Sequence, residues 1–196
     1  MLTDAAALVL AGGKSSRMGT DKVQLELTAG ETLLDRAVGF WQALCGVVYA
    51  AVGTPEHLSD APGVPVYDAR PGCGPMAGLE AGLQACEQPL LFVCAADMPA
   101  LSAARAMELY AAIGGADACV FRLDGRPEPL FGLYRRSCLP VVQRLLESGQ
   151  YRLRALLDAV DTVYLDTEDD AAFRNLNTPA EFARARQQLA AGQTET

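Results

Sequence analysis

Short apolar runs alternate with longer amphipathic segments along nearly the whole chain, and few folds accommodate this pattern. The apolar runs have the length of buried strands, which we predict at residues 6–10, 47–52, 64–67, 90–94, 118–121, 130–134 and 162–165. Helices are predicted at residues 32–44, 76–86, 103–112, 137–147, 152–158 and 179–190. The alternation predicts an α/β fold with a doubly wound, mainly parallel sheet.

A length of 196 residues is enough for one domain with its own core. The sequence contains no repeat or linker that would divide it, so we predict a single domain over residues 1–191 and a disordered tail over 192–196. The last helix is expected to start with a capping box, because Thr178 can act as N-cap, Pro179 fits the first helical position and Glu181 the third.

The carboxyl ends of the predicted strands indicate where a ligand would bind, since ligands of doubly wound sheets gather beyond those ends. Gly12 follows the first strand, Asp68 the third and Asp97 the fourth. We therefore expect a glycine-rich loop and two carboxylates to face one crevice.

The glycine-rich loop contains Lys14 and Lys22, the chain's lysines, and Arg17 lies between them. Glycine allows close approach of the backbone to a ligand, and lysine supplies a compact positive charge, so the loop is typical of a polyphosphate site. It is not a Walker A motif, because the glycine needed five positions before Gly13 is replaced by Leu8.

The composition excludes several classes of partner. The net charge is −8, which disfavours nucleic acid and anionic membranes, and no apolar run reaches membrane-spanning length. The six cysteines lack zinc-site spacing, and His57 is the chain's one histidine, so we expect reduced, mostly buried thiols and a cytoplasmic protein.

Asp97 allows two interpretations. A strand-end carboxylate can fill one coordination position of Mg²⁺ while water and phosphate oxygens fill the others. Alternatively, Asp97 caps the turn that contains Pro99. Asp68 has a similar position but can equally be an ordinary loop residue.

Two further segments carry polar or glycine-rich patterns. Residues 72–77 imitate a dinucleotide fingerprint, but Pro71 and Pro75 interrupt it, so a tight turn that starts a helix is favoured. Asn175 and Asn177 alternate along an extended segment and should face one side, where amides can orient a heterocycle or a phosphate. For Asn177, an Asx turn before the last helix is the stronger local interpretation.

Five blocks of this chain resemble the molybdenum cofactor guanylyltransferases, a family within the nucleotidyltransferase superfamily. The blocks occur in the family's order and cover residues 10–22, 74–78, 96–99, 128–134 and 175–181. The resemblance implies a Rossmann-like nucleotidyltransferase fold and an enzyme that transfers GMP from GTP to the terminal phosphate of molybdopterin, with Mg²⁺ as cofactor. Molybdoenzyme chaperones or acceptor enzymes are possible partners of such an enzyme.

The resemblance also assigns roles to residues. It implies nucleotide binding by Leu10, Ala11, Gly12, Gly13, Lys22, Asp68 and Asp97, a Mg²⁺ site on Asp97, catalysis by Arg17, Lys22 and Asp97, and a pterin side with Asn175 and Asn177. One departure is Ala50, where the family often has an asparagine after the second strand. The pair Gly12–Gly13 favours the guanylyl branch, since cytidylyl relatives tend to have alanine before their loop glycine.

Other functions stay open at this stage. One alternative keeps the chemistry and changes the substrates, with cytidylyl transfer to molybdopterin or nucleotidyl transfer to a phosphorylated metabolite. Another, of a different class, is a catalytically silent nucleotide-binding regulator.

Overall fold

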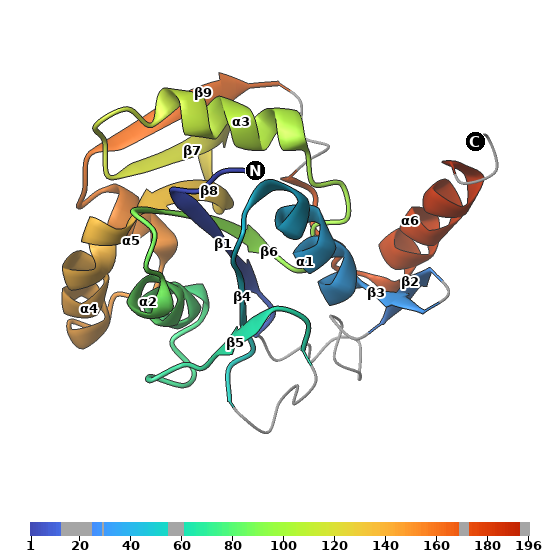
Figure 1. The fold of residues 1–196 in the computed structure, drawn as a ribbon, viewed down its shortest axis with the longest axis horizontal. Helices are drawn as coiled ribbons and strands as arrows, with labels where there is room; N and C mark the ends of the chain where they lie inside the picture. Colours follow the sequence, from blue (N-terminus) through green and yellow to red (C-terminus); the bar gives the residue numbers. More distant parts are fainter. Residues whose placement is uncertain (13–24, 29, 55–60, 169–172, 193–196) are drawn as a thin grey trace.

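A seven-stranded sheet runs through the centre of the molecule in the order β5-β4-β1-β6-β8-β7-β9 (Figure 1). The computed structural model describes residues 1–12, 25–28, 30–54, 61–168 and 173–192. The strands of this sheet are β1 (Ala5–Leu10), β4 (Val48–Ala51), β5 (Val64–Val66), β6 (Leu90–Ala95), β7 (Ala118–Leu123), β8 (Arg126–Arg135) and β9 (Thr162–Thr167). All of them match predicted strands, with boundaries that differ mainly at β8.

The sheet is mainly parallel, as predicted. β5, β4, β1 and β6 pair in parallel, and so do β7 and β9. β8 runs antiparallel to both of its neighbours, β6 and β7. The reversal follows from the turn between β7 and β8, where Asp124 has φ 49° and Gly125 has φ 74°. Positive φ at both central residues is typical of the type I′ turn that joins two antiparallel strands.

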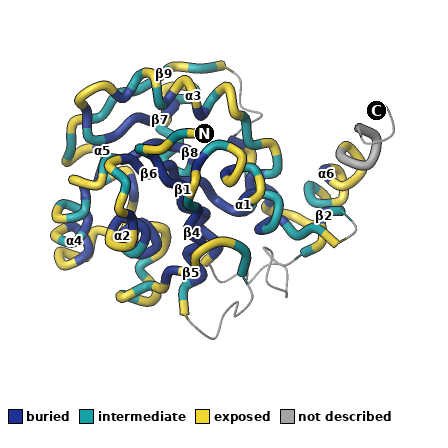
Figure 2. The backbone as a smooth tube through the Cα atoms, in the orientation of Figure 1, coloured by how far each residue is buried: buried dark blue, intermediate teal, exposed yellow. Residues whose placement is uncertain are grey.

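Helices cover both faces of the sheet. They are α1 (Leu33–Leu44), α2 (Pro75–Ala85), α3 (Ala103–Ala112), α4 (Leu139–Glu147), α5 (Leu153–Leu157) and α6 (Pro179–Gly192). Alternate residues of β1 point to opposite layers, because successive side chains of a strand face opposite sides. Ala5, Ala7 and Val9 pack in one core cluster with residues of α1 and α3, and Leu8 packs in the other with residues of α2, α4 and α5. Figure 2 accordingly shows the central strands as buried.

A small second layer lies beside α1. The strands β2 (Glu26–Thr28) and β3 (Glu31–Thr32) form an antiparallel hairpin, which was not predicted, and α6 packs against β2 (Figure 1). Their shared core contains Leu27, Leu33, Leu176 and Ala185. This arrangement brings the segment before α6 back to the start of α1.

The capping box predicted for α6 is confirmed. The Glu181 amide donates to Thr178 Oγ1 over 3.2 Å, and the Thr178 amide donates to Glu181 Oε2 over 2.8 Å. Hydrogen bonds from the amides of Asn177 and Thr178 stabilise the ionised carboxylate, so the pKa of Glu181 lies below its ordinary value.

Two predicted elements differ from the structure because of proline. The helix predicted at 137–147 is a short 3-10 helix, Arg136–Cys138, followed by α4, because Pro140 lacks an amide hydrogen and would clash with the carbonyl one turn earlier. β8 starts at Arg126, whereas the strand was predicted to start at residue 130, so its first half contains Pro127 and Pro129. These prolines are tolerated because this half of β8 extends beyond its pairing with β6.

The cysteines are free, and all except the half-buried Cys73 are buried, as predicted. In the core, the Trp41 indole donates to Cys94 Sγ over 3.0 Å, and burial raises the pKa of the Cys94 thiol to about 12. Within the described ranges, no helix is both long and apolar enough to cross a bilayer. The predicted tail reaches beyond the described residues at 193–196, so that prediction stays untested.

Gly63 provides a test of the packing before β5. Its φ is +83°, and a Cβ added there would lie 2.8 Å from the Val48 carbonyl oxygen. Gly63→Ala therefore combines an unfavourable φ with a backbone overlap, and we expect a loss of about 2–4 kcal/mol in the free energy of unfolding. Gly125→Ala is the matched control, because Gly125 has φ +74° but no atom within 4 Å of the added Cβ. Urea unfolding should show a loss of only about 1 kcal/mol for this control. Equal losses of stability for Gly63→Ala and Gly125→Ala would contradict the overlap with the Val48 carbonyl.

Candidate active site

β1 and its two neighbours in the sheet, β4 and β6, end side by side at one edge of the sheet. The Ala11 amide donates to the Ala51 carbonyl over 2.9 Å, and the Ala96 amide donates to the Leu10 carbonyl over 3.0 Å. These bonds continue the parallel pairing one residue beyond the strand ends. The segments that follow β1, β4 and β6 therefore leave the sheet at one edge, as the sequence predicted.

Gly12 and Asp68 are brought together at this edge through Gly53. A Cβ on Gly12 would lie 3.6 Å from the Gly53 amide nitrogen, so the chain after β1 passes close to the end of β4. The Asp68 amide donates to the Gly53 carbonyl over 2.8 Å. Gly53 was not predicted as part of the site. The family position compared above, Ala50, lies inside β4 and is completely buried, so it does not face the crevice.

Asp68 lies in an electrostatically unfavourable place for a carboxylate. It is half-buried, and its Oδ1 would lie 3.9 Å from a Cβ on Gly78 of α2. Burial raises the pKa of Asp68 above its ordinary value, and the negative charge of Glu80 raises it further. The ionised carboxylate of Asp68 would therefore be stabilised by a hydrogen-bond donor or a positive charge placed next to it.

Glu80 is a second acid that the sequence analysis did not single out. Glu80 is only 3% exposed, and its Oε2 lies 3.5 Å from Arg70 Nε. Arg70 also donates from Nη2 to Glu147 Oε1 of α4 over 3.2 Å. The pair connects the segment after Asp68 to α2 and α4. The sequence offered one signal for Glu80, because it is an acidic residue among the apolar and small residues of α2.

The first turn of α2 approaches the same edge. Gly74 precedes Pro75 with φ 67°, and as a glycine it has no side chain that could cap the helix. This confirms the tight turn that starts a helix, in place of a dinucleotide fingerprint. A Cβ on Gly78 would lie 2.7 Å from Leu10 Cδ2, so glycine is what lets α2 pack closely on the end of β1.

Asp97 lies two residues after the end of β6, in a turn closed by the Met98 amide, which donates to the Ala95 carbonyl over 3.3 Å. Asp97 is half-buried and Met98 is buried. The Leu176 amide donates to the Asp97 carbonyl over 3.0 Å. The structure therefore joins two predicted site segments that are far apart in the sequence.

The two asparagines differ in their surroundings. Asn175 is half-buried, and its Oδ1 is inaccessible to solvent and accepts no hydrogen bond from the part of the chain that the structure describes. A buried acceptor of this kind calls for an explanation such as a ligand. Asn177 is exposed, and its amide donates to Glu181 Oε2 over 2.7 Å at the start of α6. Asn175 is thus the better placed of the two to contact a substrate.

Gly13, Arg17 and Lys22, together with Lys14, lie outside the described residues, so their predicted roles stay predictions. Among the residues that are described, no group of three or more histidine, cysteine or acidic side chains could hold a metal ion. Separate carboxylates at a strand edge fit Mg²⁺ that arrives with substrate phosphates, because that ion is usually held by one or two carboxylates plus phosphate oxygens and water.

The raised pKa of Asp68 leads to a prediction about stability. A carboxyl group whose folded pKa lies above its ordinary value of 3.8 binds its proton more tightly when folded. Its contribution to stability is therefore lost as pH rises from about that value through the folded pKa. Asp68→Asn should remove this loss, so the variant gains thermal stability relative to the parent at pH 7 and not at pH 3.

Asp166→Asn is the control, because the pKa of Asp166 is shifted in the opposite direction to that of Asp68. Hydrogen bonds from Arg122 hold the pKa of Asp166 below its ordinary value, so its contribution is present at neutral pH and is lost as pH falls. This variant should be no more stable than the parent at pH 7. Melting curves at both pH values check the pair, and a destabilised Asp68→Asn at pH 7 would contradict the unfavourable burial of Asp68.

The chain is similar in sequence to known proteins. A family model described as the MobA-like NTP transferase domain matches residues 7–165. A probable molybdenum cofactor guanylyltransferase of Chloroflexus aggregans is 35% identical over 188 residues, which cover 89% of this chain and 89% of that protein. A probable molybdenum cofactor guanylyltransferase of Mycobacterium tuberculosis is 34% identical over 180 residues, covering 89% of this chain and 90% of that protein.

Solved structures share the fold. Molybdopterin-guanine dinucleotide biosynthesis protein A of Archaeoglobus fulgidus superposes with a TM-score of 0.81 at 23% identity, covering 95% of this chain and 99% of that one. This likeness confirms the nucleotidyltransferase fold that the sequence resemblance implied. The family model spans most of the described sheet, from β1 to β9. The chain therefore belongs to the MobA-like NTP transferase family.

Proposed function

We propose that this protein transfers GMP from GTP to the terminal phosphate of molybdopterin, releasing pyrophosphate and forming molybdopterin guanine dinucleotide. The observation that carries the proposal is the agreement between relatives and geometry. Relatives named molybdenum cofactor guanylyltransferase match 89% of the chain, and the segments that follow β1, β5 and β6 place Gly12, Asp68 and Asp97 at one edge of the sheet.

The proposed reaction needs no dedicated base. An oxygen of the acceptor phosphate donates an electron pair to the α-phosphorus of GTP, and the bond from that phosphorus to the bridging oxygen breaks, so pyrophosphate leaves with the electron pair. A phosphate monoester has a second pKa of about 6, so the nucleophile is largely ionised at pH 7. The protein's task is to align the two phosphates and to offset their charge.

The nucleotide would lie along the strand edge. The Ala11 amide is already bonded to β4, so other backbone groups of the Leu10–Gly12 segment must contact the nucleotide. Asp68 would accept hydrogen bonds from donor groups of the nucleoside, which also relieves its unfavourable burial. Lys22 and Arg17, if they act as the resemblance implies, would stabilise the departing oxygens. Asn175 would present its buried acceptor to the pterin side.

Mg²⁺ is the cofactor that we propose, with Asp97 as its protein ligand. The ion would supply positive charge that neutralises phosphate oxygens. The free thiols of the described cysteines fit a reducing compartment such as the cytoplasm. Chaperones or acceptor enzymes of molybdoenzymes stay predicted partners.

The function is tested by incubating the protein with GTP, Mg²⁺ and molybdopterin and analysing the products by mass. We expect a guanine dinucleotide and one pyrophosphate per dinucleotide, with little product when CTP or ATP replaces GTP. Preference for CTP would contradict guanylyl transfer, and GTP binding without turnover would favour the silent regulator. Asp97→Asn should abolish product, while Asp161→Asn, an exposed acid before β9, should not change it.

The loop lysines provide a second test. If Lys22 contacts developing charge, Lys22→Met should lower kcat by about a hundredfold, as expected for the loss of one preorganised electrostatic donor. Lys14→Met is the matched control, because it makes the same change in the same loop. Steady-state kinetics should show a much smaller effect for Lys14. A rate within a factor of about two of the parent for Lys22→Met would remove Lys22 from the catalytic residues.

A further inference from the structure

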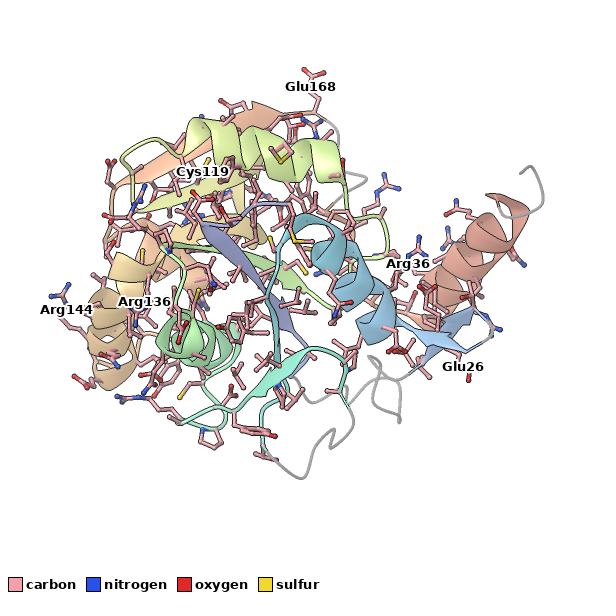
Figure 3. The ribbon with its side chains drawn as sticks, in the orientation of Figure 1. Glu26, Arg36, Cys119, Arg136, Arg144 and Glu168 are labelled. Atoms are coloured by element: carbon pink, nitrogen blue, oxygen red, sulfur yellow. The ribbon has the colours of Figure 1, made fainter. Side chains whose placement is uncertain are left out.

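The Asp97 turn is held from two sides by groups that belong to distant parts of the chain. On one side, the Leu176 amide donates to the Asp97 carbonyl over 3.0 Å. On the other, Arg36 donates from Nε to the Pro99 carbonyl over 3.2 Å. Figure 3 labels Arg36 beside α1, on the side that faces α6. The backbone of the turn is thus held at two carbonyls, that of Asp97 and that of Pro99, and the Asp97 carboxylate projects from this held backbone.

The position of Arg36 is itself well determined. It lies in the first turn of α1, directly after a capping box in which the Thr32 amide donates to Asp35 Oδ2 over 2.9 Å and the Asp35 amide donates to Thr32 Oγ1 over 3.1 Å. The Cα of Arg36 is therefore fixed by the start of the helix.

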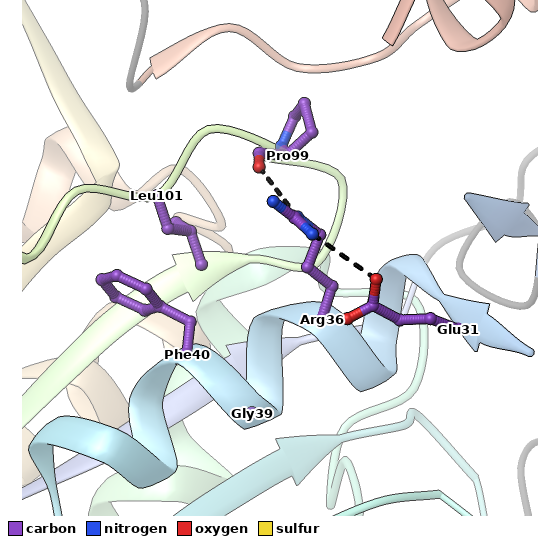
Figure 4. A pocket seen from close by; sticks show the side chains of 6 residues that line it. All are labelled: Glu31, Arg36, Gly39, Phe40, Pro99 and Leu101. Carbon is purple, nitrogen blue, oxygen red and sulfur yellow. Dashed lines mark hydrogen bonds and ion pairs between the residues drawn. The ribbon is translucent and has the colours of Figure 1, made fainter. Parts of the chain in front are cut away.

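The guanidinium is also fixed. Its Nη1 lies 3.4 Å from Glu31 Oε2, and the same oxygen accepts from Thr28 Oγ1 over 3.1 Å. A chain of contacts thus runs from the β2–β3 hairpin through Glu31 and Arg36 to Pro99 (Figure 4). Arginine suits this place because its planar fork can serve two acceptors at once, whereas lysine offers a point charge.

A cavity of about 280 Å³ lies beside this contact, lined by Glu31, Arg36, Gly39, Phe40, Pro99 and Leu101. In Figure 4 the ring of Phe40 and the side chain of Leu101 lie together on one side of it, and Arg36 reaches across to Pro99 on the other. The side chain of Arg36 is 33% exposed, so it is not a core residue and its contacts are open to water.

We infer that Arg36 is a positioning residue for guanylyl transfer, which acts by holding the Pro99 carbonyl and through it the Asp97 turn. The inference rests on the proposed role of Asp97. Arg36 does not reach the reacting phosphates in this account; it sets the direction of the carboxylate that would hold the metal ion. Misplacement of such a group by a distant change can lower the rate by up to about a hundredfold.

The test compares Arg36→Met, Arg36→Lys and the control Arg122→Met. Arg122 has a similarly exposed side chain, 38%, and pairs with Asp166 in β9, away from the Asp97 turn. Arg36→Met should lower kcat by about ten- to a hundredfold with melting behaviour close to that of the control. Arg36→Lys should lie between, since it can reach one acceptor at a time. Arg122→Met should keep the parent rate.

A readout independent of turnover is amide hydrogen exchange at Met98 and Leu176, whose amides close and fasten the turn. Loss of the Arg36 bond should speed exchange at both by about fivefold, the factor expected for one net hydrogen bond. Binding of Mn²⁺ in the presence of GTP, followed by electron paramagnetic resonance, should weaken when Arg36→Met is made in the parent and should not change when it is made in the Asp97→Asn variant.

Two outcomes would overturn the inference: unchanged exchange at both amides, or Mn²⁺ binding that Arg36→Met weakens equally with and without Asp97. Either leaves the proposed function intact. A parent protein that makes no guanine dinucleotide would instead sink the proposed function, and the exchange measurement would still report whether Arg36 holds the turn.

Discussion

Parallel pairing of β5, β4, β1 and β6 is the constraint on which the site depends. Parallel strands share a direction, so their carboxyl ends meet at one edge, and the hydrogen bonds of Ala11, Ala96 and Asp68 show that this register continues beyond the strands. Segments from four places in the sequence, those of Gly12, Gly53, Asp68 and Asp97, are thereby brought together. A change that shifted β1 relative to β4 would separate Gly12 from Gly53 and open the crevice.

Much of this edge could be predicted because its strands are completely buried. β1 and β6 are apolar at every position, since helices cover both faces, and uninterrupted runs of that length mark parallel strands. Residues that directly follow such runs are then placed by topology alone. This is why Gly12 and Asp97 could be assigned to one edge from the sequence. The helix predicted at residues 103–112 also has the boundaries of α3, which begins after the Ser102 cap.

The parts that were missed depend on contacts between segments far apart in the chain. The β2–β3 hairpin is too short for a periodic pattern, and its stability comes from packing on α6. Glu80 is an ordinary helix residue by local propensity, and its burial beside Arg70 follows only from the path of the segment after β5. By its local sequence, Arg36 is likewise an ordinary polar residue in the first turn of a helix, and its contact with Pro99 follows only from the folded structure. Local sequence can mark an acid among apolar residues, as at Glu80, but it does not say which distant residue such a side chain will contact.

The two acids at the edge are held in different ways, and the difference suits different tasks. Asp68 is half-buried next to a second negative charge, so a ligand that donates hydrogen bonds would stabilise its ionised form. Asp97 is fastened through its own carbonyl and through Pro99, by the segment before α6 on one side and by α1 on the other. A metal ligand needs a defined direction. Because these two fastenings come from near the beginning and near the end of the described chain, the correct geometry of Asp97 exists only when the whole domain is folded.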